Sequence, residues 1–537
     1  MRHIRRAQPE DLNRIAEIEV FCYRLNFYPI FRSDEFYFDE MTVPNLMPLR
    51  ADFIPDILVY DDGVVKGFLH IGGVFTAMVG ERAAHTSGGK VILRIEDTDK
   101  KREVAGGVGQ IVQGLRDFGI TFDEGATGDD SEQGAYGPYT QSKRAEIYQT
   151  VAKSLVEKGL AYPCFCTEDE LSATREKQES AKLRTGYYGE FANCRNLSYE
   201  QIKAKIDAGC KYVVRLRSPG DESKRIVFDD MIKGKIEMPE NDEDFVLLKS
   251  DGIPTYHFAH AVDDHLMRTT HVIRGDEWIS SVPKHIQLFK LLGFKVPKYA
   301  HVAPIMKEDN GSKRKLSKRK DPEAAVRFYI EQGYPADSVT EYLLTVANSD
   351  FEEWRRANQG VSNENFKLNL KKMSVSGALF DLAKLNDISK NVISKFDANT
   401  VLNFVIEWAK EFDSELYELI NADTDYALQI FTIDRDVPKP RKDIAKWNEV
   451  KDYVSYFYDS IFENEYILPE HISNADAVKI LELYKNVYDE NDDRNAWFDK
   501  IKLVAPNLGF AAETTDSSVD FPALGNPTRP TSASTLS

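Results

Sequence analysis

The stretch GFLHIGG, residues 67–73, decides the fold, because a β-rich run ends at His70 and two glycines, Gly72 and Gly73, open a helix predicted over 72–84. Glycine lets a backbone approach a phosphate closely, and a helix N-terminus offers N–H groups and the positive end of the helix dipole. His70 is then placed to donate to a phosphoryl oxygen. Taken alone, such a turn is more often an ordinary strand-to-helix connection.

A second element lies about 240 residues further on, where SKRKLSKRK at residues 312–320 places six cations in nine residues. A loop of this kind can close over a triphosphate and neutralise the charge of departing pyrophosphate, with Lys315 and Lys318 as its cations. On its own it would more often be a solvated basic loop or an RNA contact. The two elements together favour a nucleotide site.

Between and beyond these elements the secondary-structure pattern changes along the chain. Strand-like runs at 91–95, 212–216, 245–248, 256–260 and 271–274 alternate with helical runs, which predicts a parallel sheet covered on both faces. After residue 322 helical spacing dominates. The expected domains are a small α/β segment at 1–69, an α/β core at 70–322 with an insertion at about 165–210, a helical region at 323–513, and a disordered tail at 514–537.

Composition narrows the class of protein. The net charge of −18 argues against nucleic-acid binding over the whole surface, although a local basic face can still contact RNA. No apolar run is long enough for a membrane span, and the N-terminus lacks a signal-peptide pattern, so we expect a cytoplasmic protein without a membrane partner. Five cysteines, an odd number, argue against a disulfide framework.

The two elements together resemble the paired motifs of class I aminoacyl-tRNA synthetases, and the intervening text resembles the bacterial glutamyl-tRNA synthetase branch. The stretches that carry the resemblance are ILRIEDTD (92–99), DGIPTYHFA (251–259), VDDH (262–265), VIRGDEW (272–278), SGALFD (376–381) and PRKD (440–443). The resemblance covers about residues 68–513. It implies a Rossmann-type class I catalytic core followed by an α-helical, anticodon-binding C-terminal half.

The resemblance also implies roles for individual residues. ATP contacts fall to His70, Gly72, Gly73, Glu277, Trp278 and Lys318, and transition-state stabilisation to His70, Lys315 and Lys318. Glutamate contacts fall to Glu96, Tyr256 and Arg274, the last by bidentate pairing with a carboxylate, and contacts near the tRNA 3′ end to Asp97 and Asp99. Structural alternatives stay open: Glu96 and Asp97 as helix caps, and an Arg274–Asp276 ion pair.

The implied reaction joins L-glutamate to ATP as glutamyl-adenylate and then transfers the acyl group to the 3′ end of tRNA(Glu). It needs ATP with Mg²⁺ and no protein nucleophile, because positioning and charge stabilisation suffice. A monomer is the family expectation. The sequence does not decide between tRNA(Glu) alone and tRNA(Glu) together with tRNA(Gln).

A zinc site is a further hypothesis for Cys164, Cys166 and Cys194. Some members of the family bind zinc in this region through a Cys-x-Cys pair and later ligands. Here Tyr187 or Tyr188 and Cys210 are the other donors on offer, and none has the spacing of a regular fourth ligand. The sequence therefore favours unliganded buried cysteines.

The N-terminal segment departs from the family. Tyr60 stands where the family has an arginine, and Val64 where it has the serine of a Pro-Ser-Pro-Thr-Gly turn. Residues 1–70 instead resemble the start of a GNAT acetyltransferase, without that fold's pyrophosphate-binding loop. The resemblance predicts a chimeric chain, and with it an alternative function: a tRNA-binding protein whose activation pocket is impaired. A small-molecule nucleotidyltransferase is disfavoured by the long helical region.

Overall fold

The computed structural model describes residues 3–6, 58–61, 70–98, 107–309, 311–317, 320–435, 437–462, 473–489, 491–492, 496 and 499–500. The chain divides into two compact units. The first comprises 1–328 and 343–380, and the second comprises 329–342 and 381–537. The GNAT-like interpretation falls mostly outside the described residues, which show only that β1 (His3–Arg6) pairs antiparallel with β2 (Leu58–Asp61).

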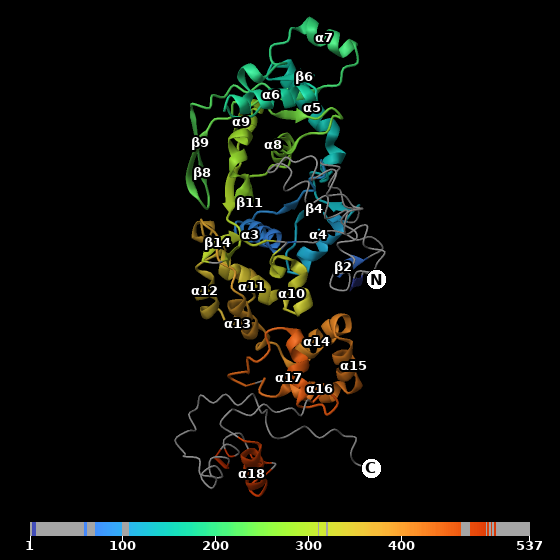
Figure 1. Ribbon diagram of the computed structural model, residues 1–537, viewed down its shortest axis with the longest axis vertical. Helices are drawn as coiled ribbons and strands as arrows, with labels where there is room; N and C mark the ends of the chain where they lie inside the picture. The colour runs from blue at the N-terminus through green and yellow to red at the C-terminus, as the bar shows by residue number, and fades with distance from the viewer. Residues whose placement is uncertain are drawn as a thin grey trace. The chain divides into compact units, whose positions relative to one another are not determined.

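The first unit is a mixed α/β structure built on short sheets (Figure 1). In one, β3 (Ile92–Leu93) is parallel to β4 (Glu124–Ala126), which pairs antiparallel with β5 (Glu132–Gln133). In another, β11 (His271–Gly275) is parallel to β12 (Lys298–Val302). The strand β8 (Arg225–Asp230) lies on the other side of β12, and β9 (Gly234–Pro239) lies at the edge beside β8. The prediction of parallel pairing is therefore confirmed for the runs at 91–95 and 271–274. It is wrong for the runs at 212–216 and 245–248, which pair antiparallel with each other, because a short apolar run does not specify the direction of its neighbour.

Helices pack against these strands. α3 (Ile71–Thr86) packs against β11 (Figure 1). The other long helices of this region are α4 (Gly107–Arg116), α5 (Ala145–Glu157), α8 (Tyr256–Leu266) and α9 (Val282–Leu292). α5, α8 and α9 share a core that includes Leu155, Phe258, Val262 and Phe289, all fully buried. The predicted strand at 256–260 is wrong: it is the first turn of α8, because packing buries almost every side of this segment, so its apolar run mimics a strand.

The insertion lies between β6 (Ala161–Cys164) and β7 (Val213–Leu216), which form an antiparallel sheet with β10 (Val246–Leu248). It carries α6 (Glu168–Ser180) and α7 (Tyr199–Asp207), each begun by a capping box, and both lie with β6 at one end of the first unit, away from α3 and α4 (Figure 1).

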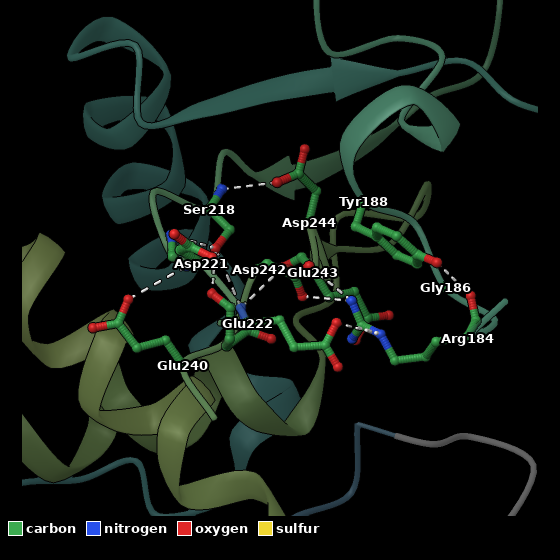
Figure 2. Close-up of polar contacts among 12 residues, drawn as sticks. Arg184, Gly186, Tyr188, Ser218, Asp221, Glu222, Glu240, Asp242, Glu243 and Asp244 are labelled. Atoms are coloured by element: carbon green, nitrogen blue, oxygen red, sulfur yellow. Dashed lines mark hydrogen bonds and ion pairs between the residues drawn. The ribbon is translucent and has the colours of Figure 1, made fainter. Parts of the chain in front are cut away.

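Buried Asp244 fastens the insertion to the core. Its carboxylate accepts from the Ser218 backbone N–H at 2.8 Å, from the Tyr162 hydroxyl at 2.6 Å and from Arg195 (Figure 2 shows Ser218 and Asp244). Arg184 donates from Nη2 to both carboxylate oxygens of Asp242, at 2.6 and 2.8 Å (Figure 2). These contacts join residues on both sides of β7 and hold the base of the insertion in place.

The described part of the second unit consists of helices and connecting turns. They are α13 (Leu382–Ile393), α14 (Ala398–Phe412), α15 (Ser414–Ala422), α16 (Thr424–Thr432), α17 (Val450–Ser455) and α18 (Asn474–Lys485). α10 (Val326–Gln332), α11 (Ala336–Ala347) and α12 (Phe351–Ala357) precede them. Aspartates cap α13 to α16 by accepting backbone N–H bonds, and Val401, Val405, Leu416 and Ile430 form a fully buried core. Among the described helices, none has the length and apolarity that crossing a bilayer requires.

Candidate active site

The turn that opens α3 is closed by its own groups. The Nδ1 atom of His70 accepts from the Gly72 N–H at 2.8 Å, and the His70 carbonyl accepts from the Gly73 N–H at 2.8 Å. A Cβ at position 72 would lie 2.9 Å from His70 Nδ1, so glycine is needed there. Because Nδ1 accepts, a neutral His70 carries its proton on Nε2, which makes Nε2 the ring's donor. The two glycine N–H groups thus act within the turn.

The basic loop leaves a hairpin formed by β13 (Met306–Asp309) and β14 (Ser312–Lys315). Lys315 Nζ lies 3.9 Å from Glu277 Oε2, which brings together two of the predicted nucleotide residues. Both side chains are more than half exposed, so they remain accessible to a ligand. Lys318 lies outside the described residues.

A buried carboxylate anchors this loop at its base. Asp321 accepts from Arg314 at 2.6 and 2.8 Å and from the Ser317 backbone N–H at 2.7 Å, and Lys307 Nζ lies 3.1 Å away. The hydrogen bonds from Arg314 lower the pKa of Asp321 well below its usual range. Leu316, which sits between the cations, is buried and holds the loop against the core.

The residues predicted to bind the glutamate side chain lie together. Arg274, on β11, donates from Nη1 to the Tyr256 hydroxyl at 3.2 Å and from Nη2 to the Trp278 carbonyl at 3.3 Å. The Tyr256 and Trp278 rings are 4.3 Å apart between centroids. The alternative pairing of Arg274 with Asp276 is not found, because Asp276 contacts Lys233 at 3.1 Å instead.

Glu96 follows β3 and is joined to α8 through Arg94. Its carboxylate accepts from Arg94 at 3.1 Å, and Arg94 also donates to Asp264 at 2.8 Å. Burial raises the pKa of Glu96, although Arg94 opposes the shift. Burial also raises the pKa of Tyr256, and the negative charge of Glu96 adds to the shift. A carboxylate here suits an ammonium ligand.

Asp97 makes a structural contact with Ser142. Its Oδ1 accepts from the Ser142 backbone N–H at 2.8 Å, at the start of the 3₁₀ turn Gln141–Arg144. Asp97 therefore acts as a cap of this turn, which was the structural alternative to a role near the tRNA. Glu96 does not cap it, because its carboxylate contacts Arg94. Asp99 lies outside the described residues.

Sequence reasoning missed the supports of this site. Fully buried Asp263 accepts from Gln141 at 3.0 Å, from Arg144 at 2.8 Å and from the Tyr148 hydroxyl at 2.7 Å. Asp263 therefore joins α8 to α5 and to the segment that leads into it. The next residue, Asp264, joins α8 to Arg94. The consecutive acidic pair in an apolar helix was the available signal, since buried carboxylates require partners.

Three sulfur atoms and one hydroxyl meet beside β6. The Sγ atoms of Cys164, Cys166 and Cys194 all lie within 4.8 Å of one another. The Tyr187 hydroxyl lies 3.3 Å from Cys164 Sγ and 3.2 Å from Cys166 Sγ. Hydrogen bonds from Cys166 and Cys194 lower the pKa of Cys164. Three thiols with a phenol beside them fit the four-coordinate, sulfur-rich sites that zinc prefers. Cys210, the other cysteine considered as a donor, is exposed and does not belong to this group.

Comparison with known proteins identifies the family. The family model described as tRNA synthetases class I (E and Q), catalytic domain, matches residues 65–387. The chain belongs to this family. The match begins after Tyr60 and Val64, the two positions at which the sequence departs from the synthetase pattern.

Individual synthetases are similar over most of the chain. A glutamate–tRNA ligase of Clostridium perfringens (strain 13 / Type A) is 53% identical over 451 residues, 83% of each chain. One of Acetivibrio thermocellus is 49% identical over 450 residues, 84% of this chain and 82% of the relative. A solved glutamate–tRNA ligase of Elizabethkingia meningosepticum, in complex with its amino acid, matches with a TM-score of 0.67 at 28% identity, covering 83% of this chain and 89% of that one.

Proposed function

We propose that this protein ligates L-glutamate to the 3′ end of tRNA(Glu) through glutamyl-adenylate at the expense of ATP. The observation that carries the proposal is the hydrogen bond between Arg274 and Tyr256 in a chain 53% identical to a glutamate–tRNA ligase. Glu96 is joined through Arg94 to Asp264, which lies on the same helix as Tyr256. A carboxylate for the ammonium group and a guanidinium with a phenol for the side chain match the two charged ends of glutamate.

In this proposal the reaction depends on positioning and charge. His70 donates from Nε2 to a phosphate of ATP, and Lys315 with Lys318 neutralises charge on the departing pyrophosphate. Glu277 and Trp278 lie against the adenosine, and Gly72 and Gly73 allow the phosphates to approach the backbone. Mg²⁺ would supply further neutralisation of the triphosphate when it is bound with ATP.

The test is exchange of labelled pyrophosphate into ATP, measured with full-length protein, glutamate and tRNA. Exchange that requires both glutamate and tRNA supports the proposal. A Glu96→Gln variant keeps the size of the side chain and removes its charge, and it should lose exchange. An exposed carboxylate far along the chain, changed as Asp207→Asn, is the matched control and should leave exchange unaltered.

The alternative function is a tRNA-binding protein that does not activate glutamate, and the absence of family residues at Tyr60 and Val64 favours it. It predicts salt-dependent tRNA binding without exchange. In that case, replacing residues 1–67 with a family-type strand and Pro-Ser-Pro-Thr-Gly turn should restore exchange. The GNAT-like origin of residues 1–69 remains part of this hypothesis.

The finer predictions follow the same proposal. The helical region at 323–513 contacts the tRNA stem and anticodon, Asp97 and Asp99 lie near the tRNA 3′ end, and the protein acts as a cytoplasmic monomer. The domain limits at 69, 322 and 513 and the tail at 514–537 also stay predictions. Deletion of 514–537 should leave charging of tRNA unchanged.

For the cysteine cluster, the meeting of four donors favours zinc over the unliganded cysteines that the sequence favours. Cys164, Cys166, Cys194 and Tyr187 would hold the ion, with a structural role for the insertion. Metal analysis of the purified protein should give about one zinc per chain. A Tyr187→Phe variant tests the fourth donor.

A further inference from the structure

Arg274 is held between histidines on two sides. Its Nε donates to His301 Nε2 at 3.1 Å, and its Nη2 lies 3.3 Å from His285 Nδ1. Both histidines are fully buried. Behind them, His301 Nδ1 lies 2.7 Å from Asp230 Oδ2, and His285 Nε2 lies 2.9 Å from His257 Nδ1. The result is a continuous chain of polar groups through the guanidinium.

The chemistry of arginine fixes every proton in this chain. A guanidinium has five N–H donors and no acceptor, so His301 Nε2 and His285 Nδ1 must both accept. His301 therefore carries its proton on Nδ1 and donates it to Asp230. His285 carries its proton on Nε2 and donates it to His257. Each imidazole is neutral, because a doubly protonated ring would have no lone pair for Arg274 and would place a second cation beside it.

The surrounding groups support these protonation states. Burial lowers the pKa of His285 well below its usual value, so the neutral form persists at physiological pH. Burial opposes ionisation of Asp230, but hydrogen bonds from His301 and from the Lys233 and Ile232 backbone N–H groups outweigh it and lower the pKa of Asp230. An ionised Asp230 keeps the His301 proton on Nδ1.

These contacts use four of the five N–H donors of Arg274. Nε–H is used by His301, both protons of Nη2 by the Trp278 carbonyl and His285, and one proton of Nη1 by the Tyr256 hydroxyl. One proton of Nη1 remains. Because the Tyr256 oxygen accepts from Arg274, its own O–H remains to donate as well. Arg274 therefore cannot make the expected bidentate pair with a ligand carboxylate, because four of its five N–H donors already bind groups of the protein.

We propose that His301, with Asp230 behind it, and His285, with His257 behind it, are positioning residues that hold Arg274 so that one N–H on Nη1 and the Tyr256 O–H together bind the side-chain carboxylate of the amino-acid substrate. This inference rests on the proposed function, since it refines how that site binds glutamate. A carboxylate offers an acceptor oxygen to each donor, whereas the amide of glutamine offers one oxygen to two donors. The clamp thereby favours glutamate over glutamine.

The kinetic test compares paired variants at each histidine. His301→Gln and His285→Asn place an amide oxygen near the position of the accepting nitrogen, whereas His301→Leu and His285→Leu remove it. The leucine variants should raise the KM for glutamate roughly 10- to 100-fold, the loss expected for a hydrogen bond to a charged group, and leave the KM for ATP unchanged. The amide variants should recover most of this loss. The control is His271→Leu, because His271 is exposed and lies on β11, the strand that carries Arg274.

Inhibition by glutamine supplies a readout that a merely structural role would not move. The leucine variants should narrow the preference for glutamate over glutamine, and the amide variants should keep it. Equal rises in the KM values for glutamate and ATP, or amide variants no better than leucine, would overturn the proposal.

A second measurement does not depend on activity. With ¹⁵N-labelled histidine, the signal lost in His301→Gln should be that of a neutral ring protonated on Nδ1, and the signal lost in His285→Asn that of a neutral ring protonated on Nε2. The opposite tautomer, or a doubly protonated ring, at either position contradicts the clamp. If the protein shows no exchange, this result separates failure of the clamp from failure of the proposed function.

Discussion

Removal of the Asp321 carboxylate should uncouple the basic loop from the core. In Asp321→Ala, Arg314 loses two charge-assisted hydrogen bonds and Ser317 loses the acceptor for its backbone N–H. The Arg314 and Lys307 side chains are 27% and 33% exposed, so water replaces part of what they lose. With about 1.5–3 kcal/mol for each hydrogen bond to a charged group, and incomplete additivity, the anchored loop loses about 3 kcal/mol.

That energy sets the expected kinetic effect. A loss of about 3 kcal/mol lowers the population of the anchored loop by roughly 100-fold if anchoring is limiting, since about 1.4 kcal/mol is tenfold. The value of kcat/KM for ATP in pyrophosphate exchange should fall accordingly, while the KM for glutamate stays close to its original value. The assay uses the full chain, or the version with the family-type N-terminal strand if only that version exchanges.

The control is Asp309→Asn, which removes the other carboxylate that contacts Arg314, at 2.7 Å. Its side chain is 36% exposed, so this ion pair contributes less than about 1 kcal/mol and the activity should stay within about fivefold. Because the pKa of Asp321 is lowered, its stabilisation is complete above the ordinary carboxyl range and is lost only in acid. An Asp321→Ala variant whose kcat/KM for ATP matches that of Asp309→Asn would refute the anchoring role.

Three further predictions concern other parts of the first unit. Asp263→Ala leaves buried Arg144 without its carboxylate partner and should lower the free energy of unfolding by about 3–5 kcal/mol in denaturant titration, against under about 1 kcal/mol for exposed Asp207→Ala. Burial raises the pKa of Glu96 above its usual 4.5, so the KM for glutamate in pyrophosphate exchange should rise as pH falls while the pH is still above 4.5. A KM for glutamate that stays constant over that range would contradict a charged Glu96 as the ligand of the ammonium group. Cys194→Ser should lower bound zinc in elemental analysis, and unchanged zinc would place the ion outside the cluster.

The sequence predicted the chemistry that sits at ends of local elements. His70 with its glycines and the cations around Lys315 follow from short motifs, because a turn or a helix start is specified by neighbours in the chain. The residues of the glutamate site were expected only because the sequence resembles the family. The helical character of the second unit followed from the helical spacing of its apolar residues. Family membership came from the joint occurrence of these motifs.

Tertiary structure decided the features that depend on pairing between distant residues. The segment 256–260 became a helix because packing buries nearly all of its sides, which erases the periodicity that separates helix from strand. Tyr187 rather than Tyr188 joined the cysteines, and His285 and His301 converged on Arg274, through side-chain directions that no local pattern encodes. A buried polar group must find a partner, but the sequence does not say which one, since only the folded chain brings the two within hydrogen-bonding distance.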